Sequence, residues 1–389
     1  MNPNTALNGH PVSEAVAAAL RNRQSVRARE ADAGPSPPQA DADPAIDIAV
    51  EPGADQPPAV LQVYGEQDYL DWMAQVANVS DDANSRLRRM AQRLPAAPLW
   101  RPLAPPPTPE ALEDLLRRFP NHAGALESLG DQAALYRAAR QGMRMQPMLL
   151  EGRPGSGKTK LARAIADTLG VPMHLIGMAH STAGFMLGGL DGGWSTARPG
   201  LPFQQLVWGR WANPVIVLDE IDKASTDDRH SPLGALYSLL EPSTAQRFCD
   251  EMIGIPIDAR AIIWIATANS LEAIPKPLLT RFQVVRIQEP TQEQMPAVLS
   301  NVWAELIGSE PWWGDCFERE LPPATVCALS DTSSLRDAAQ RLRRGAARAA
   351  VAGRRQVLPQ DLPMKDDRNA VPRHPIGFMP QGSPARGRE

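Results

Sequence analysis

Residues Gly152 to Thr159 constrain the fold of this 389-residue chain more than any other stretch. They read Gly-Arg-Pro-Gly-Ser-Gly-Lys-Thr and match the spacing G-x-x-x-x-G-K-S/T in full. Glycines in such a loop let successive backbone N–H groups approach phosphate oxygens, and the helix that follows presents its positive end to the same anion. We expect Lys158 to reach the β- and γ-phosphates and the Thr159 hydroxyl to complete a Mg²⁺ shell. The nucleotide-binding residues predicted here are Gly152, Arg153, Pro154, Gly155, Ser156, Gly157, Lys158, Thr159 and Lys160.

Short apolar runs alternate with helical patterns through the middle of the chain. Near-continuous apolar runs are typical of strands that are buried on both faces, and strands that alternate with helices indicate a parallel sheet. The sequence therefore predicts an α/β fold of three layers, in which helices cover both faces of a mostly parallel five-stranded sheet. The five runs are Met148–Leu150, Met173–Ile176, Val215–Leu218, Ile262–Ala266 and Phe282–Ile287.

An acidic pair follows the third of these runs, because Leu218 leads directly into Asp219 and Glu220. Open α/β sheets place their ligands at the carboxyl ends of the strands. We expect Asp219 to hold Mg²⁺ together with Thr159, and Glu220 to act as the general base on the attacking water. The alternative, in which the two acids only belong to a turn before the next helix, stays open at this stage.

Charge and cysteine content exclude several classes of protein. The chain has 40 Lys+Arg and 44 Asp+Glu, a formal net charge of −4, so it lacks the strongly basic surface of a nucleic-acid-binding protein. Its three cysteines form no C-x-x-C pair, which argues against a disulfide framework or a zinc site. No apolar stretch is long enough to cross a bilayer, and the amino terminus has no leader pattern. We expect a cytoplasmic protein without a membrane partner.

Three further stretches carry a family resemblance. They are Asn-Pro-Val-Ile-Val-Leu-Asp-Glu-Ile-Asp-Lys at 213–223, Ala-Thr-Ala-Asn-Ser at 266–270 and Ile-Pro-Lys-Pro-Leu-Leu-Thr-Arg at 274–281. Together with the glycine-rich loop, they resemble the AAA+ ATPases, most of all the ATPase module of Lon, over about residues 141–351. The resemblance identifies the two candidate sites with the Walker A and Walker B motifs of a P-loop NTPase. It also implies a small helical lid subdomain after the sheet.

The resemblance implies roles for four more residues. Asn269 matches the sensor-1 position, which contacts the γ-phosphate or orients the water, and Arg336 matches sensor 2 of the lid. Arg281 matches the arginine finger that reaches the nucleotide of a neighbouring subunit, although it also fits an ordinary surface arginine. Trp194 aligns with the aromatic residue of the pore loop that grips polypeptide, although it also fits a residue that packs against its own loop.

Composition and resemblance together predict the organisation of the chain. The chain has 39 prolines, and nine of them lie in residues 1–58, where little apolar surface is available to offset the ordering of the chain. We expect a disordered Ala/Pro-rich region at 1–64, a small helical segment at 65–94 and a Pro-rich linker at 95–109, which marks a domain boundary. The large α/β ATPase subdomain follows at 110–290, the helical lid at 291–352 and a flexible tail at 353–389.

The function implied by the resemblance is hydrolysis of ATP to ADP and phosphate with Mg²⁺. The implied assembly is a homo-oligomeric ring, a hexamer in the family, that remodels an unidentified protein substrate. Two alternatives stay open: an assembly or adaptor protein that is gated by nucleotide and hydrolyses slowly, and a nucleic-acid-handling loader, which the near-balanced charge disfavours. Because the chain after Arg336 is too short for a serine–lysine protease domain, we do not expect protease activity.

Overall fold

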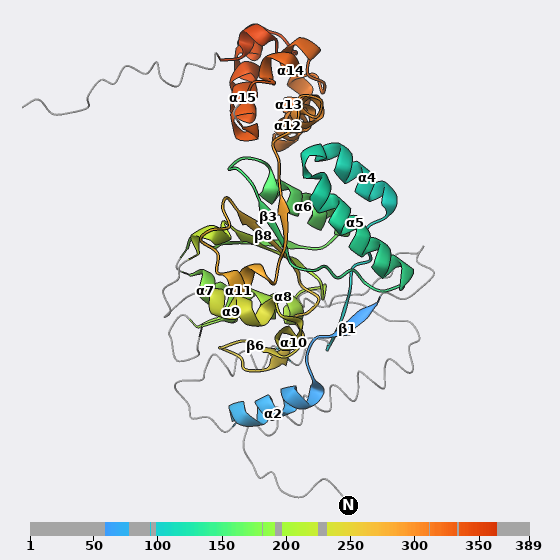
Figure 1. The fold of residues 1–389 in the computed structure, drawn as a ribbon, viewed down its shortest axis with the longest axis vertical. Helices are drawn as coiled ribbons and strands as arrows, with labels where there is room; N and C mark the ends of the chain where they lie inside the picture. Colours follow the sequence, from blue (N-terminus) through green and yellow to red (C-terminus); the bar gives the residue numbers. More distant parts are fainter. Residues whose placement is uncertain are drawn as a thin grey trace, which may run out of the picture. The chain divides into compact units, whose positions relative to one another are not determined.

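The computed structural model describes residues 59–77, 94, 99–180, 182–190, 197–224, 232–310, 312–332 and 334–363. The chain divides into two compact units, with the boundary after Gln294. Figure 1 shows a sheet with helices in the first unit and helices alone in the second.

A five-stranded sheet forms the centre of the first unit. Its strands lie in the order β4-β5-β8-β3-β9, and all four pairings are parallel. The sheet confirms the predicted α/β fold, because each of the five apolar runs of the sequence contributes one strand. The strands are β3 (Met148–Glu151), β4 (Met173–Gly177), β5 (Val215–Asp219), β8 (Ile263–Ala268) and β9 (Gln283–Arg286).

Successive residues of each strand point to opposite faces of the sheet and so build two separate cores. In β5, Val215 and Val217 join one core, whereas Ile216 and Leu218 join the other. The first core includes buried side chains of α4 (Pro109–Arg118), α5 (Ala123–Ala138) and α6 (Lys158–Leu169). The second includes those of α7 (Ala183–Gly188), α8 (Leu201–Trp208) and α9 (Pro232–Leu239). The predicted three layers are therefore present (Figure 1).

Short elements connect these layers. They are the 3-10 helices η2 (Pro120–His122) and η3 (Ile221–Lys223), the helices α10 (Pro242–Ala245) and α11 (Lys276–Leu279), and the antiparallel strands β6 (Phe248–Cys249) and β7 (Pro256–Ile257). Two expected helix ends are confirmed. Thr108 accepts a hydrogen bond from the Ala111 N–H at 3.3 Å at the start of α4, and Gly170 ends α6 in a left-handed conformation with a φ of 66°.

The amino-terminal segment differs from the expectation. Residues 59–64 fall in the region predicted to be disordered, but β1 (Val60–Gln62) pairs antiparallel with β2 (Trp100–Pro102). α2 (Glu66–Ala77) forms where the helical pattern predicts it. Its residues Tyr69, Trp72 and Met73 are buried in the same core as α7, α8 and α9. Residues 59–77 are therefore an integral part of the first unit.

The predicted Pro-rich linker at 95–109 is wrong as a free spacer and as a boundary. Residues 95–98 lie outside the described part, but the chain from residue 99 onward is bonded to the body of the unit. The guanidinium of Arg101 is buried and donates to the carbonyl oxygens of Leu206 and Val207. The Asn213 side chain accepts from the Ala104 N–H at 2.9 Å and donates to the Met143 oxygen at 2.9 Å. These partners lie far along the chain, which is why local composition does not indicate them.

The second unit is built from helices alone within its described residues. Its core contains the aromatic side chains Trp303, Trp313 and Phe317, which pack at ring distances of 5.3–6.1 Å. The elements are α12 (Met295–Ser309), α13 (Trp313–Cys316), α14 (Pro323–Leu329), α15 (Leu335–Val351) and the 3-10 helix η4 (Pro359–Asp361).

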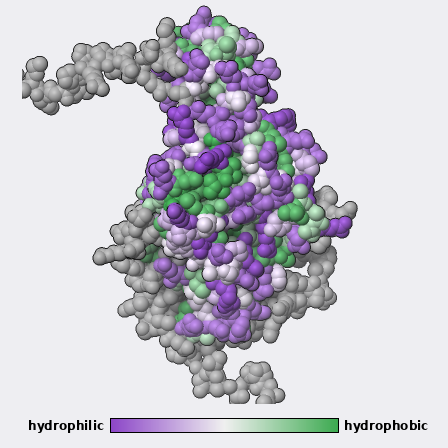
Figure 2. All heavy atoms as spheres, viewed as in Figure 1, coloured by the Kyte–Doolittle hydropathy of each residue, from purple (hydrophilic) through white to green (hydrophobic). Residues whose placement is uncertain are grey.

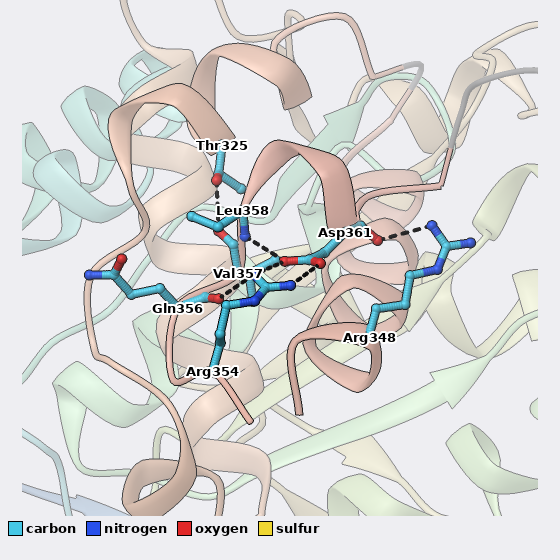
Figure 3. Close-up of polar contacts among 7 residues, drawn as sticks. All are labelled: Thr325, Arg348, Arg354, Gln356, Val357, Leu358 and Asp361. Carbon is cyan, nitrogen blue, oxygen red and sulfur yellow. Dashed lines mark hydrogen bonds and ion pairs between the residues drawn. The ribbon is translucent and has the colours of Figure 1, made fainter. Parts of the chain in front are cut away.

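This unit extends into the predicted tail, since residues 353–363 are packed rather than free. Val357 and Leu362 are buried in its core. The Asp361 carboxylate accepts two hydrogen bonds from the Arg354 guanidinium, at 2.6 and 2.7 Å, and a third from the Leu358 N–H at 2.8 Å (Figure 3). The Thr325 hydroxyl donates to the Val357 oxygen at 2.7 Å. These bonds fix η4 to the unit, so the flexible tail cannot begin at residue 353.

Polar residues cover much of the described surface in the view of Figure 2. Among the described residues, no helix is both long and apolar enough to cross a membrane.

Candidate nucleotide-binding site

The loop between β3 and α6 has the backbone that a phosphate cradle requires. Gly155 and Gly157 have φ values of 81° and 96°, which residues with a Cβ rarely adopt. A Cβ at Gly152 would lie 2.9 Å from the Ile287 oxygen, so the loop also packs closely against the chain after β9. α6 begins at Lys158, directly after this turn. The glycines predicted from spacing therefore occupy positions where glycine is needed.

Lys158 is buried inside this loop. Its ammonium donates to the Gly152 oxygen at 2.6 Å, the Arg153 oxygen at 3.1 Å and the Asn269 Oδ1 at 3.2 Å. Burial lowers the pKa of Lys158, and the nearby carboxylates of Asp222 and Asp219 oppose this shift. These three hydrogen-bond partners are neutral oxygens, so the ammonium is placed to take an anion. The structure thus brings Asn269, from the end of β8, to the predicted phosphate loop.

Asp219 is the centre of a hydrogen-bond network at the carboxyl end of β5. Its Oδ1 accepts from the Thr159 hydroxyl at 3.0 Å and from the Thr267 hydroxyl at 2.8 Å. Thr267 in turn accepts from the Glu220 N–H at 2.9 Å. Sequence reasoning missed Thr267. The available signal was a single hydroxyl in an otherwise apolar strand.

Glu220 has a backbone conformation that is unusual for its residue type. Its φ of 55° lies in the left-handed region, where among the described residues Arg140 is the only other non-glycine. Such outliers persist where the surrounding structure holds them, and they are common at functional sites. The Glu220 carboxylate is partly exposed and pairs with the Lys223 ammonium at 2.8 Å, a bond that raises the pKa of Lys223. Glu220 therefore lies beside Asp219 with its carboxylate reachable from solvent.

The residues present fit a triphosphate and Mg²⁺. The Ser156 Oγ and the Asp222 Oδ1 are buried without a hydrogen-bond partner. A bound ligand or a water molecule could satisfy both of these polar groups. Thr159 and Asp219 offer the hard oxygen ligands that Mg²⁺ prefers. Within the described residues, no group of three His, Cys, Asp or Glu side chains lies close enough together to hold a metal ion.

His122 is a further residue near this site that the sequence did not indicate. Its ring is buried, its Nδ1 lies 3.0 Å from the Asn121 Oδ1, and its Nε2 has no partner. Burial lowers its pKa to about 4, and the charge of Lys158 contributes in the same direction. Its Nε2 is thus a buried ring nitrogen without a hydrogen-bond partner. A lone histidine outside any motif gave no signal for this.

Arg281 is not brought to the phosphate loop of its own chain. β9 runs parallel to β3 with Gln283 beside Met148, so Arg281 lies at the amino end of β3, whereas the phosphate loop follows its carboxyl end. Its guanidinium lies 3.8 Å from the Glu241 carboxylate and 5.1 Å from the Tyr237 ring centre. It also lines an open cavity of about 850 Å³.

Three further predicted site residues have exposed side chains. Arg153 and Lys160 are exposed, and Arg153 pairs with Glu289 at 2.6 Å. Arg336 is exposed on the first turn of α15 in the helical unit, where the Asp337 N–H caps on Ser334 as its spacing predicts. Trp194 lies outside the described residues.

A parallel α/β sheet, a glycine loop and a helix that begins at a buried lysine define the class: this domain has the P-loop NTPase fold. Residues 148–289 match the family model described as "ATPase family associated with various cellular activities (AAA)". The Lon protease of Finegoldia magna is 39% identical over 150 residues, which are 38% of this chain and 19% of that protein. The mitochondrial Lon protease homolog of Phaeodactylum tricornutum is 36% identical over 140 residues, which are 36% of this chain and 16% of that protein.

Residues 148–289 therefore match the AAA family model, and this part of the chain is similar to Lon proteases, as the sequence motifs predicted. The match spans less than a fifth of each of these relatives.

Two solved structures of RuvB from Thermotoga maritima also align with the chain. The Holliday junction branch migration motor has a TM-score of 0.39 at 16% identity and covers 66% of this chain and 67% of that chain. A point variant has a TM-score of 0.43 at 17% identity and covers 62% and 67%.

Proposed function

We propose that this protein binds ATP with Mg²⁺ at the β3–α6 loop and hydrolyses it to ADP and phosphate. The observation that carries the proposal is the convergence of Lys158, Thr159, Asp219 and Asn269 at the carboxyl edge of the sheet. These four residues come from three separate segments: the start of α6, the end of β5 and the position after β8. They meet where α/β sheets place their ligands. Bound Mg²⁺ would supply charge neutralisation at the phosphates, with Thr159 and Asp219 as its protein ligands.

The chain's own residues divide the chemistry among them. Lys158 binds the β- and γ-phosphates through its ammonium, and the glycine loop donates backbone N–H groups to the same oxygens. Glu220 accepts a proton from the water whose oxygen attacks the γ-phosphorus, while the bond from that phosphorus to the bridging oxygen breaks. Asn269 orients that water or reports the γ-phosphate. The Lys223 ammonium lies against the Glu220 Oε2, which leaves Oε1 as the second acceptor oxygen of this carboxylate.

Completion of the site by a neighbouring copy is part of the proposal. Arg281 lies at the amino ends of the strands, whereas its own phosphate loop follows the carboxyl end of β3. This separation supports a role toward the nucleotide of another subunit. A fixed guanidinium there would stabilise charge on the phosphoryl oxygens in the transition state. Arg336 would close over the phosphates from the helical unit. The assembly implied by the resemblance is a ring, with a hexamer as the expected number.

We extend the proposal to the use of the energy: turnover moves the chain between states that remodel a protein substrate, with Trp194 as the residue that engages polypeptide. Loss of γ-phosphate contacts after hydrolysis is the general way in which such a switch becomes mechanical. The alternative is a nucleotide-gated adaptor with slow turnover. A Trp194→Ala variant separates the two, since a remodeller loses polypeptide-stimulated turnover and keeps its basal turnover, whereas an adaptor keeps both.

The experiment that tests the proposal is ATP turnover as a function of protein concentration. We expect the specific activity of the wild type to rise with concentration, since each site needs a neighbour. Glu220→Gln should bind ATP and lose at least about 100-fold in kcat, in line with general-base catalysis. Arg281→Ala should bind ATP normally and lose turnover at every concentration. Full activity of Arg281→Ala would contradict the shared site, and full activity of Glu220→Gln would contradict the assigned base.

A further inference from the structure

Asp250 is a buried carboxylate that the proposed hydrolysis does not use. It follows β6 directly and is 1% exposed. Its hydrogen-bond donors among the described residues are backbone N–H groups rather than a guanidinium or an ammonium. A buried charge without an ionic partner is costly unless hydrogen bonds satisfy it, so its presence asks for a structural reason.

Backbone N–H groups from two distant segments satisfy this carboxylate. Its Oδ2 accepts from the Gly200 N–H at 2.6 Å, at the point where α8 begins. Its Oδ1 accepts from the N–H groups of Met252 and Ile253, at 2.9 and 3.2 Å, in the connection between β6 and β7. One side chain therefore holds the described ends of the α7–α8 connection, residues 189–190 and 197–200, together with the β6–β7 connection, residues 250–255.

The α7–α8 connection is shaped to receive the carboxylate. Gly189 has a φ of 86°, and a Cβ there would lie 2.6 Å from the Asp250 Oδ1. A Cβ at Gly200 would lie 2.5 Å from the Leu187 oxygen. Backbone bonds add to the junction, since the Glu251 N–H donates to the Gly188 oxygen at 2.8 Å and the Leu190 N–H donates to the Arg198 oxygen at 3.0 Å. The two ends of the connection and the β6–β7 turn therefore meet at one point.

Only an ionised carboxylate suits this junction, because both of its oxygens face N–H donors. Burial raises the pKa of Asp250 to about 6, so at pH 7 and above it is mostly ionised and accepts on both sides. An asparagine of the same shape has one oxygen and one NH₂ group. Its oxygen accepts from the N–H groups of one segment, while its NH₂ group faces the N–H donors of the other segment.

We infer that Asp250 is a positioning residue that ties the α7–α8 connection to the β6–β7 connection, so that the two act as one unit when a polypeptide engages the protein. The last step rests on the proposed function, because Trp194 lies within the first of these connections. The tie itself rests on the hydrogen bonds and the glycine spacing alone.

Hydrogen–deuterium exchange at pH 7.5 tests the tie in full-length Asp250→Asn. We expect exchange to rise about five- to tenfold both in the peptide that carries Gly200 and in the peptide that carries Met252, in line with the loss of hydrogen bonds to a charged group. Exchange in β5 and β8 should stay unchanged, which shows that the variant is folded. Asp258→Asn is the matched control. Asp258 is a buried carboxylate after β7 that accepts hydrogen bonds from the Arg260 guanidinium. A rise in only one of the two peptides, or an equal rise in the control, overturns the tie.

ATP turnover with and without a permanently unfolded, carboxymethylated protein tests the positioning role. We expect Asp250→Asn to keep basal kcat within about twofold and to lose at least about threefold of the polypeptide stimulation, with Asp250→Glu intermediate. Unchanged stimulation in Asp250→Asn overturns the role. If the wild type itself shows no stimulation, the proposed remodelling fails, and the exchange measurement alone decides whether Asp250 ties the two connections.

Discussion

Thr267 shows how one hydroxyl organises the candidate catalytic residues. It donates to the Asp219 carboxylate and accepts from the Glu220 N–H, so it touches both members of the acidic pair. Glu220 has a left-handed backbone, which needs support from its surroundings. Thr267 is therefore expected to position Glu220 rather than to take part in the chemistry.

Thr267→Val tests this role, because valine keeps the shape and removes the hydroxyl. The Glu220 N–H would lose its acceptor, which costs about 1–3 kcal/mol for a buried group. We expect a lower free energy of unfolding by about that amount and a fall in kcat, with ATP affinity within threefold of the wild type. Thr267→Ser, which keeps the hydroxyl, should recover most of kcat. Equal kcat for Thr267→Val and the wild type would show that Glu220 needs no such support.

The sequence predicts the site residues that belong to local patterns and misses those that depend on strand register. Lys158 and Asp219 are indicated by a spaced motif and by a strand that ends in acids. Thr267 reaches Asp219 because β5 and β8 pair with Leu218 beside Ala266. His122 reaches the region of Lys158 through packing of the chain before the sheet. No single-sequence pattern encodes either of these contacts.

At the scale of elements, the amino-terminal segment is the clearest departure from the sequence prediction. The five strands were predictable because buried runs are short, apolar and bounded by helix signals. Nearby prolines predict disorder for residues 59–64 and a spacer for residues 95–109, whereas the pattern at 65–94 predicts a helical segment. The described residues of these stretches pack on the body through Trp72, Arg101 and the bond from Ala104 to Asn213, which depend on tertiary contacts alone.

Trp72→Ala tests whether this segment belongs to the core of the ATPase unit. Trp72 is 6% exposed, and truncation of a buried tryptophan costs about 3–5 kcal/mol. We expect the urea midpoint for the sheet to fall, with faster amide exchange in β5 and β8. Gln75→Ala, on the exposed face of the same helix, should have no effect. Unchanged exchange in the sheet would mean that the segment folds as a separate piece.

The Asp361 and Arg354 pair gives the helical unit a pH dependence. Hydrogen bonding to the Arg354 guanidinium holds the pKa of Asp361 below its ordinary value of 3.8 (Figure 3). A depressed folded-state pKa contributes stability that is present above pH 3.8 and is lost as the pH falls through the folded-state value. Asp361→Asn should therefore melt below the wild type at pH 7, and the difference in melting temperature should shrink toward pH 3.

Glu320→Gln, at an exposed carboxylate of the same unit, is the control for Asp361→Asn. Its melting temperature should equal that of the wild type at every pH. A difference between Asp361→Asn and the wild type that stays constant from pH 7 to pH 3 would contradict the assigned role of the ion pair.

At the scale of the whole molecule, the chain combines an AAA domain with an added amino-terminal segment and a helical unit. The similarity to Lon covers less than half of this chain and less than a fifth of each relative reported above, so the substrate is a question for experiment. The near-balanced net charge of −4 favours a protein over a nucleic acid as the partner. All of these proposals depend on the binding of nucleotide at the β3–α6 loop.

Calorimetric titration of Mg²⁺–ATP into the wild type and Lys158→Met tests that claim most directly. The buried ammonium would bond the phosphates through charge-assisted hydrogen bonds, so its loss should weaken ATP binding by at least about tenfold. The melting temperature without nucleotide should stay the same or rise, because a desolvated charge is removed. Lys276→Met, at an exposed lysine of α11, should bind as the wild type does. Absence of Mg²⁺–ATP binding by the folded wild type, or equal affinity in Lys158→Met, would contradict the account.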